Sequence, residues 1–554
     1  MNKHLPIGIE DYVDAQRYYY VDKTAFIKEL IDGYVGKSML IIRPRFFGKT
    51  LLLSMVDHFF DIDKSSEAVF EGKAVFRDDA RYRDYLNAFP TVHLNMKNVN
   101  GHGAEEIIAK AKAVVVDAYR AHSYLLRSSS IYENDRNTFE DILNGRELPD
   151  YVYHAAVLKL CAMLSAHFGK RVVLLIDEYD TPLQSAYENG IYDRCIPFFK
   201  ELYSSALKGN PSLLFAICTG VLEISKESLF SGLNSLERCS VADGAFATDL
   251  GFTEAEVREL LGTFGMGDRF EEAKRWYGGY RIGEAEVFNP WSMLHFVKNG
   301  TVGPYWVNTG SNALLDTLLS EGKREGLLNL LNGPSSIELN LSINYRDLDS
   351  DPSAVYSYLV HAGYLRIRAI DGRACIVDTV NEEIFEMFKR DIVGRTVEKD
   401  ALAIADRLRD AFLSGDTDEI GAILETYVVA SYSYFDLGRE KDYQNMLTGL
   451  LAVLFDRYVV KSEVNGKNGR CDIMVCPKSP DGIGMVVEVK HYGYVLSRNK
   501  IREKALEAIR QIERRGYEGE LRRLGCRTIL LYGFAFDSKK HAVEGKAIGS
   551  VSAA

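Results

Sequence analysis

The chain has 554 residues and a formal charge of −11, with 47% apolar and 26% charged residues. This balance is typical of globular proteins and excludes wholesale disorder, a collagen-like repeat and a protein coated in basic charge. No apolar run is long enough to span a bilayer, and the eight cysteines form no CxxC pair or zinc-ligand spacing. We therefore expect a soluble, cytoplasmic protein of about three or four domains, with reduced thiols and no membrane partner.

The first half of the chain alternates short aliphatic runs with longer amphipathic segments. The aliphatic runs predict strands at Ser38–Ile42, Thr91–Asn95, Val172–Ile176 and Leu213–Cys218. The amphipathic segments predict helices at Lys49–Phe60 and Tyr153–His167. Continuous apolar strands separated by helices are typical of a parallel sheet covered on both faces, so we expect an α/β domain over residues 1–250.

A tripeptide with phosphate-binding chemistry follows the first strand. Gly48, Lys49 and Thr50 complete a strand–loop–helix segment, where backbone N–H groups and Lys49 can bind phosphates and the Thr50 hydroxyl can ligate Mg²⁺. The opening glycine of the usual phosphate-binding loop is replaced by Arg43. By itself, the tripeptide also fits an ordinary loop.

Two further strands end in residues that suit nucleotide chemistry. The strand from Val172 ends in Asp177 and Glu178, which can hold Mg²⁺ and polarise the attacking water, respectively. A buried strand that simply ends in solvated carboxylates is the alternative. The next strand ends in Thr219, which can sense the γ-phosphate. In this order, the three features predict a P-loop ATPase with ATP and Mg²⁺ as cofactors.

The middle of the chain offers a helix start but no further chemistry. Thr253 followed by Glu256 is a capping box, which predicts the first helix of a helical lid and linker over residues 251–400. From about residue 440 to 535, a helix–strand–strand–helix–strand pattern predicts a separate α/β domain over residues 401–554.

Two neighbouring strands of this last domain carry charges that suit metal-dependent hydrolysis. Segments 470–476 and 484–490 are expected to form a hairpin, with Glu488 and Lys490 on one face because strand side chains alternate. If Asp472 faces the same side, two carboxylates can bind Mg²⁺ while Lys490 positions water or steadies the phosphate charge. Surface charges on an edge strand are the alternative.

Several longer motifs resemble the bacterial "AAA-ATPase-like" family, in which an ATPase module is typically followed by a nuclease-like domain. They are Tyr20–Thr24, Arg43–Thr50, Ile176–Asp180, Thr219–Leu222, Ser225–Asn234, Trp276–Tyr280 and Asn289–Trp291. In that family the Arg-Pro-Arg opening is usual, so the resemblance implies that Arg43, Pro44 and Arg45 contact the nucleotide. Phe46 stands where the family usually has a second arginine.

The C-terminal segment resembles the PD-(D/E)XK nuclease fold. The resemblance implies that Glu440, at the start of a helix, supplies the first acidic position, and that Gln511 on a later helix steers substrate. With Asp472, Glu488 and Lys490, they form the expected catalytic set. Cys471 replaces the proline that names the motif, and the fold also contains members that do not cut nucleic acid.

The charge distribution near this site has two interpretations. Residues 490–541 hold 13 lysines and arginines against six acids, a local +7 in an acidic protein, which suits a nucleic-acid partner. Arg502, Glu503 and Lys504 also interleave as ordinary ion pairs on a helix surface do.

The favoured hypothesis is an ATPase module that regulates a Mg²⁺-dependent nuclease, with DNA favoured over RNA as substrate and a homo-oligomer possible. The alternative is a nucleotide-dependent switch or scaffold whose nuclease-like domain binds nucleic acid or a protein partner without cutting. A nuclease whose ATPase module binds nucleotide without hydrolysing it is a third hypothesis.

Overall fold

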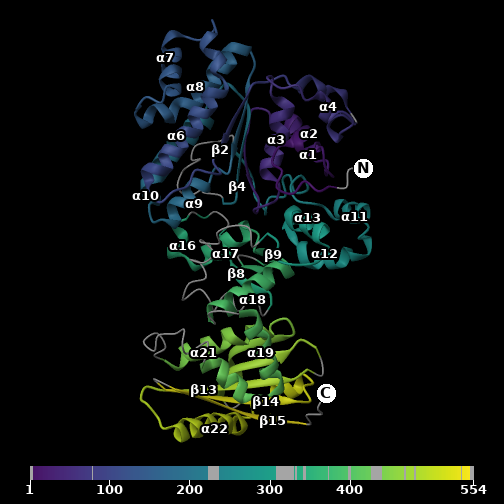
Figure 1. Cartoon of the computed structure of the whole chain (residues 1–554), viewed down its shortest axis with the longest axis vertical. Helices are drawn as coiled ribbons and strands as arrows, with labels where there is room; N and C mark the ends of the chain where they lie inside the picture. Colours follow the sequence, from purple (N-terminus) through teal and green to yellow (C-terminus); the bar gives the residue numbers. More distant parts are fainter. Residues whose placement is uncertain are drawn as a thin grey trace. The chain divides into compact units, whose positions relative to one another are not determined.

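The computed structural model describes residues 4–77, 79–222, 236–306, 330, 333–340, 343, 345–371, 374–396, 401–425, 439–466, 469–479, 482–537 and 540–549. The chain divides into two compact units, the first of residues 1–318 and 336–383 and the second of residues 319–335 and 384–554 (Figure 1). The motif at Ser225–Asn234 lies outside the described residues. The division into three domains at residues 250 and 400 stays a prediction.

A five-stranded parallel sheet, in the order β2-β3-β4-β1-β5, forms the centre of the first unit. Its strands are β1 (Ser38–Ile42), β2 (Thr91–Asn95), β3 (Val172–Asp177), β4 (Leu213–Gly220) and β5 (Leu236–Cys239). The four strands expected from aliphatic runs are present, β3 and β4 being slightly longer than expected. Strand β5 was not expected, because its residues 236–238 are at least partly exposed and two of them are charged.

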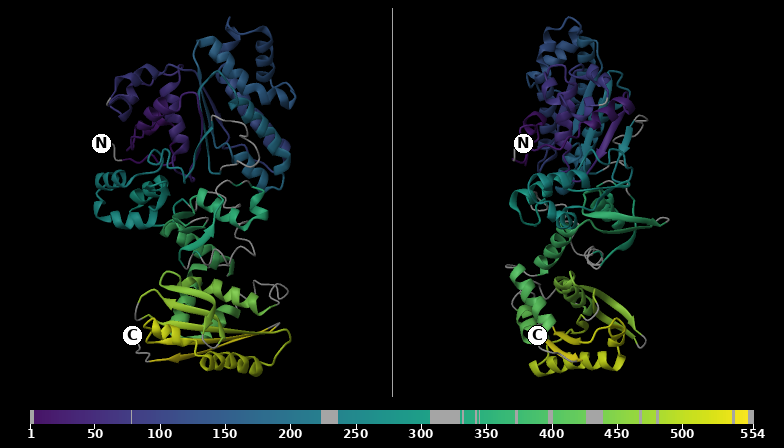
Figure 2. Two further views of the ribbon diagram at one scale, coloured as in Figure 1. Left: turned by 180° about the vertical axis from the view of Figure 1, so that it is seen from behind. Right: turned by 90° about the vertical axis from the view of Figure 1, so that its right-hand side faces the viewer.

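Helices cover both faces of this sheet (Figures 1 and 2). One face packs against α2 (Ala25–Gly33) and α3 (Lys49–Phe60), and the other against α6 (Ala104–Ala121), α8 (Asp150–Phe168) and α10 (Tyr192–Leu207). The shorter helices of this part are α1 (Tyr12–Ala15), α4 (Glu67–Phe70), α5 (Ala74–Arg77), η1 (Ala80–Tyr85), η2 (Ser123–Arg127), α7 (Glu133–Leu143) and α9 (Thr181–Glu188). The predicted α/β layering is confirmed.

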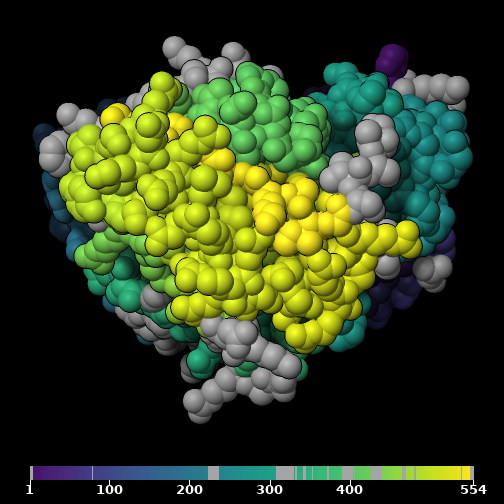
Figure 3. Space-filling view, turned by 90° about the horizontal axis from the view of Figure 1, so that it is seen from below, coloured from purple at the N-terminus to yellow at the C-terminus, as the bar shows by residue number. Residues whose placement is uncertain are grey.

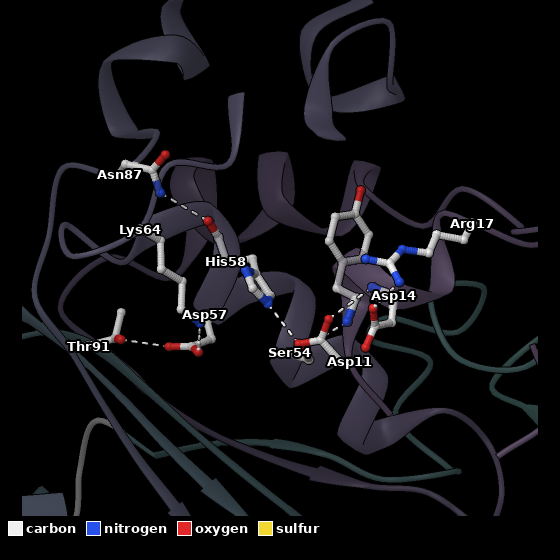
Figure 4. A network of polar contacts seen from close by, with 10 residues as sticks. Asp11, Asp14, Arg17, Ser54, Asp57, His58, Lys64, Asn87 and Thr91 are labelled. Atoms are coloured by element: carbon white, nitrogen blue, oxygen red, sulfur yellow. Dashed lines mark hydrogen bonds and ion pairs between the residues drawn. The ribbon is translucent and has the colours of Figure 1, made fainter. Parts of the chain in front are cut away.

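A polar network anchors α3, the helix that follows the phosphate-loop motif (Figure 4). His58 Nε2 lies 2.9 Å from Asp11 Oδ2, which ties the helix to the start of the chain. Asp57 accepts a hydrogen bond of 2.6 Å from the Thr91 hydroxyl on β2 and pairs with Lys64. These partly buried contacts hold the C-terminal end of α3 against its neighbours.

The remainder of the first unit is more mixed than the helical lid that the sequence predicts. Its helices are α11 (Glu254–Thr263), η3 (Gly267–Arg269), α12 (Phe270–Tyr277), α13 (Pro290–Asn299), α16 (Asp347–Ser350) and α17 (Pro352–His361). Two small sheets, β6-β7 and β8-β10-β9, accompany them, formed by Tyr280–Ile282, Ala285–Val287, Ser335–Glu338, Ala374–Thr379 and Leu365–Asp371. The capping box is confirmed, since Thr253 and Glu256 exchange both hydrogen bonds.

The second unit is built on a mixed sheet in the order β11-β12-β13-β14-β15. Its strands are β11 (Tyr458–Gly466), β12 (Gly469–Pro477), β13 (Gly484–Tyr492), β14 (Ile529–Asp537) and β15 (His541–Ile548). The expected hairpin is confirmed as the antiparallel pair β12-β13, whereas β11 and β15 were not expected. Only β13 and β14 pair in parallel, and α22 connects them, as a crossover between parallel strands requires.

Helices also cover this sheet on two sides (Figure 1). Helix α22 (Arg498–Arg515) lies on one face of the sheet (Figure 1), and its Ile509 and Ile512 join a core with Ile529 and Leu531. The opposite side carries α19 (Ala401–Ser414) and α21 (Glu440–Leu450). The other helices are α18 (Glu382–Thr396), α20 (Thr417–Ile423), η5 (Leu451–Leu454) and α23 (Glu518–Arg523). The C-terminal residues of this unit form much of the surface seen in Figure 3.

The structure tests two expectations from composition, the reduced thiols and the absence of a membrane-spanning helix. All eight cysteines are buried, unbridged thiols. Across the residues that the structure describes, we find no helix with the length and apolar character needed to cross a membrane.

Candidate functional site

The loop between β1 and α3 has an unusual backbone. Gly48 has φ +86° and Phe46 has φ +63°, so two residues of this short turn adopt left-handed conformations. Glycine accepts this geometry readily, whereas the Phe46 ring is held by packing 4.8 Å from Trp291 on α13. Because the first N–H groups of a helix lack intrahelical acceptors, the turn directs those of α3 outward as an anion-binding site.

The ammonium group of Lys49 is buried in this loop. Its Nζ donates 2.9 Å hydrogen bonds to the carbonyl oxygens of Arg43 and Pro44. Burial lowers the pKa of Lys49, while the nearby Glu178 carboxylate acts in the opposite direction. A lysine has three donors, so two hold it over the loop and one is left to contact a phosphate oxygen.

The acids of β3 meet the polar end of β4. Asp177 is fully buried and accepts a hydrogen bond from the Thr219 hydroxyl through Oδ1, while its Oδ2 has no partner within the described ranges. Glu178 has φ +51°, and its N–H donates to the same hydroxyl at 3.3 Å. Burial raises the pKa of Glu178, and Asp177 adds to that effect. A buried carboxylate oxygen without a donor suits a cation.

A cavity of about 450 Å³ opens beside these groups. The expected residues that line it are Arg45, Gly48, Lys49, Thr50 and Glu178. Its other lining includes Glu10, Lys97, Asp180 and Trp291, which sequence reasoning missed. Lys97 follows β2, so its place after a neighbouring strand of the same sheet was the available signal. The cavity combines phosphate-binding groups with the aromatic side of α13, which fits a nucleotide.

Arg43 and Pro44 serve the fold of the loop. Arg43 is fully buried, and its guanidinium donates to the backbone carbonyls of Ile42, Cys239, Ala245 and Phe246. The expected nucleotide contact through the Arg43 side chain does not match this geometry.

Pro44 packs against the backbone of Gly363, where a Cβ atom would lie only 2.7 Å from the Pro44 Cβ. Of the Arg-Pro-Arg segment, Arg45 is the residue whose side chain faces the cavity, where it donates to Gln184 at 3.2 Å.

The second site lies on the paired strands β12 and β13. Asp472 Oδ2 accepts a 2.7 Å hydrogen bond from the Val489 N–H, which aims this carboxylate at β13. Lys490 Nζ lies 3.0 Å from Glu488 Oε1, as alternation on the strand allows. Glu488 is only 2% exposed, and its Oε2 lacks a hydrogen-bond partner among the residues that the structure describes.

Burial and neighbouring charges shift the pKa values of the ionisable groups in this site. Burial raises the pKa of Glu488 to about 7, and the Asp472 carboxylate adds to the effect. Burial likewise raises the pKa of Asp472. For Lys490, burial acts to lower the pKa, but Glu488 and the other carboxylates outweigh it and the pKa is raised. The site is therefore rich in negative charge and favours a bound cation.

The two residues implied by the family resemblance also reach this site. Gln511 on α22 donates a hydrogen bond to Glu488 Oε1. Glu440, at the start of α21, is exposed and accepts a 3.4 Å hydrogen bond from the backbone of His491. Its charge acts on Asp472, Glu488 and Lys490. The structure thus brings together all five of the residues expected from the sequence.

A further residue, Gln444 on α21, was not expected. Its amide donates 2.7 Å to the backbone carbonyl of Asp472, which fixes β12 against the helix.

The donor set of this site fits Mg²⁺. Across the described ranges, no three His, Cys, Asp or Glu side chains converge closely enough to hold a metal ion, and the two coupled carboxylates at this site are those of Asp472 and Glu488. Magnesium is commonly bound through one or two carboxylates, with water and substrate phosphate completing the coordination. The unpartnered Glu488 oxygen is the group that such an ion would satisfy.

Comparison with known proteins finds a family match for each of the two segments that hold these sites. Residues 6–230 match the protein family described as "Predicted AAA-ATPase", and residues 438–546 match the PD-(D/E)XK nuclease superfamily. The chain thus carries a segment similar to an AAA-ATPase-like domain, followed by a segment similar to a PD-(D/E)XK nuclease superfamily domain. Both resemblances expected from the motifs are confirmed.

A relative of this chain is the "Uncharacterized protein in vnfD 5'region" of Azotobacter chroococcum mcd 1. The two are 30% identical over 323 residues, which is 58% of this chain and 56% of the relative. The chain thus spans about half the length of the curated relative that it matches.

Proposed function

We propose that this protein is an ATP-binding and ATP-hydrolysing enzyme whose ATPase domain regulates a Mg²⁺-dependent nuclease domain. The observation that carries the nuclease proposal is Glu488, a carboxylate that is 2% exposed, has one unpartnered oxygen and is in contact with Lys490. An isolated buried carboxylate oxygen is costly, and a metal ion at this position would satisfy it.

In the ATPase domain, different residues contact different parts of the bound nucleotide. The N–H groups at the start of α3 and the ammonium of Lys49 bind phosphate oxygens, and Arg45 adds positive charge from the cavity wall. Thr50 and Asp177 fit a Mg²⁺ ion. Glu178 orients the attacking water, and its raised pKa makes it a better proton acceptor than an exposed glutamate.

In the nuclease domain, Asp472 and Glu488 would hold the metal ion, which when bound lowers the pKa of water and neutralises phosphate charge. Lys490 lies next to Glu488 and can position the water or the phosphate. Gln511 fixes the Glu488 carboxylate through a hydrogen bond. Glu440 lies at the rim and can contact a substrate from the side of α21.

A chain of contacts within the first unit supports regulation by nucleotide. Trp291, in the first turn of α13, lines the nucleotide cavity, and the adjacent Ser292 donates a 2.8 Å hydrogen bond to Glu383 Oε2. Glu383 is fully buried, and its Oε1 accepts another 2.8 Å bond from the Trp306 N–H. Glu383 lies in the first turn of α18, the helix in which the chain passes from the first unit to the second.

A movement of α13 on nucleotide binding would therefore act directly on the start of α18. We propose this contact as the route by which ATP alters the nuclease domain, with ATP acting as a gate.

The decisive experiment measures cleavage of single- and double-stranded DNA and RNA by wild type and Lys490→Ala. Each reaction is run with Mg²⁺ or Mn²⁺, with and without ATP. Lys461→Ala, which removes an exposed lysine from the neighbouring strand β11, is the matched control. We expect cleavage by wild type and Lys461→Ala and its loss in Lys490→Ala. Equal cleavage by Lys490→Ala would refute the site, and no cleavage by wild type would favour the non-cutting switch.

The regulatory contact has its own test. Glu383→Gln replaces one of the two hydrogen-bond-accepting oxygens at the start of α18 with an amide donor, and Ser292→Ala removes its partner on α13. Glu286→Gln, an exposed position on β7, is the control. We expect the two contact variants to bind ATP normally but to lose most of the ATP dependence of cleavage. Retention of full ATP dependence by both would disprove this route.

A further inference from the structure

Two tyrosines extend the active face of β13. Because side chains alternate along a strand, Tyr492 projects on the same face as Glu488 and Lys490. Four residues of a strand cover about 13 Å, so Tyr492 lies about that far from Glu488 along the strand. The face of β13 therefore leads from the proposed cleavage site to an aromatic ring.

Tyr494 lies beside Tyr492 and is unusually exposed. The two ring centroids are 6.1 Å apart in an edge-to-face arrangement, and the Tyr494 side chain is 63% exposed. Val495, the next residue, is 50% exposed. Large apolar side chains together on a surface indicate a contact site, because their exposure to water is unfavourable. The ring of Tyr494 has a face available to stack with another flat group.

One lysine, which also pairs with Glu507, lies over the first of these rings, and further basic residues are close to the rings in sequence. Lys504 on α22 places its Nζ 5.5 Å from the centre of the Tyr492 ring. Lys490 precedes the rings on the strand, and the first turn of α22, directly after the loop, begins with the exposed residues Arg498 and Lys500. Rings that stack with bases, combined with cations that contact phosphates, are the two elements of a single-strand binding groove.

We propose that Tyr494, supported edge-to-face by the partly buried Tyr492, forms a stacking platform for unpaired bases, so that the nuclease domain takes single-stranded nucleic acid or a single-stranded end as its substrate. This inference rests on the proposed function and names its substrate class. In a duplex, the faces of the bases are covered by their neighbours, so a duplex cannot occupy the platform without unstacking. The rings thus select for strands whose bases are exposed next to the scissile phosphate.

The test measures binding separately from cleavage. Every protein carries Lys490→Ala, so that the bound strand stays intact. The probes are oligonucleotides that contain 2-aminopurine, whose fluorescence falls on stacking, prepared as single-stranded DNA, single-stranded RNA and the matching duplexes. Tyr494→Ala removes the exposed ring and Tyr494→Phe keeps it. Tyr151→Ala, at a position on α8 that is 70% exposed, is the control.

We expect single strands to bind more tightly than duplexes, with quenching of 2-aminopurine. Tyr494→Ala should weaken single-strand binding about tenfold and abolish the quenching, because stacking of one base on an aromatic side chain contributes about 1–3 kcal/mol. Tyr494→Phe and Tyr151→Ala should behave like the parent. The DNA and RNA arms show which sugar is accepted.

Equal binding by Tyr494→Ala and Tyr151→Ala, or equal affinity for duplex and single strand, would overturn the inference. The outcome is distinguishable from failure of the proposed function. If the Lys490-containing wild type cuts nothing but the ring-dependent quenching is observed, the platform stands and the cleavage proposal fails. If cleavage is observed and the quenching is independent of Tyr494, the platform is wrong.

Discussion

The two sites each pair a lysine with a buried carboxylate, yet their charges are arranged in opposite ways. In the ATPase domain, the ammonium of Lys49 is held by two backbone carbonyls, and burial lowers its pKa. In the nuclease domain, the ammonium of Lys490 is held by the Glu488 carboxylate, and its pKa is raised. Lys49 is thus bonded to neutral carbonyl groups with the Glu178 carboxylate nearby, whereas Lys490 is bonded directly to Glu488 and Asp472 adds a second negative charge.

This difference indicates which ligand each site favours. The first loop presents an ammonium bonded only to backbone carbonyls in the described structure, together with the N–H groups of a helix, a combination that favours a phosphate. The second site presents two carboxylates to one lysine, a combination that favours a divalent cation before phosphate. The same residue type thus contributes to anion binding at one site and to metal-dependent chemistry at the other.

The largest expected effect comes from removing a carboxylate of the second site. Glu488→Gln should abolish Mg²⁺ binding there and lower cleavage by about a thousandfold or more, because the metal contributes most of the catalysis. Glu503→Gln, an exposed acid on α22, is the control. Calorimetric titration with Mg²⁺ and the cleavage assay measure the two effects. Normal Mg²⁺ binding by Glu488→Gln would break the comparison.

Removing the lysine of the first site should leave the second intact. In wild type, ATP at about one hundred times its Kd should stabilise the fold by about 2.7 kcal/mol and raise the Tm. Lys49→Ala should lose most of this shift but keep Mg²⁺ binding in the nuclease domain. Lys208→Ala, at an exposed lysine after α10, serves as the control. A full ATP-induced shift in Lys49→Ala would contradict the assignment.

Glu383 is a third buried carboxyl group, and it differs from Glu488 because both of its oxygens accept hydrogen bonds. Burial raises its pKa to about 8. The unfolded chain loses this proton near pH 4.5, so the stability that the neutral form contributes is lost as pH rises from about 4.5 to 8, at about 1 kcal/mol per pH unit. Glu383→Gln should remove this dependence. Urea unfolding of both proteins between pH 5 and 8 is the measurement, and parallel curves would contradict it.

The smallest effect concerns the turn itself. Gly48 has φ +86° and open space around it, so Gly48→Ala should cost about 1 kcal/mol through backbone strain alone. Gly262, within α11, also has open space but ordinary helical geometry, so Gly262→Ala should leave the protein unchanged or slightly more stable. Thermal unfolding of the two variants tests this, and equal changes would argue against the left-handed turn.

Much of this structure could be predicted from local pattern. The aliphatic runs located β1 and β2 to the residue, and Thr253 with Glu256 located the start of α11, because both signals are encoded within a few neighbouring residues. The five residues of the nuclease site were also expected, partly from alternation and partly from resemblance. Local sequence pattern therefore predicts strands, helix caps and motif residues.

The missed features depend on contacts between distant segments. Arg43 was expected at the nucleotide, but its guanidinium binds carbonyls about 200 positions later in the chain, which no local pattern reveals. Trp291 and Lys97 reach the cavity from α13 and from the end of β2. Strand β5 was missed because it is short and its middle is exposed. Tertiary packing decided all four outcomes.

The contacts behind the phosphate loop determine how this protein can be dissected. Gly363 lies against Pro44, and Gly251 donates its N–H to the Phe47 carbonyl and lies against the Phe47 ring. A fragment ended at residue 250 would remove both contacts and the aromatic wall of the cavity. A fragment meant to keep the loop between β1 and α3 intact should therefore retain the chain to residue 383, because segments far beyond the parallel sheet support this loop.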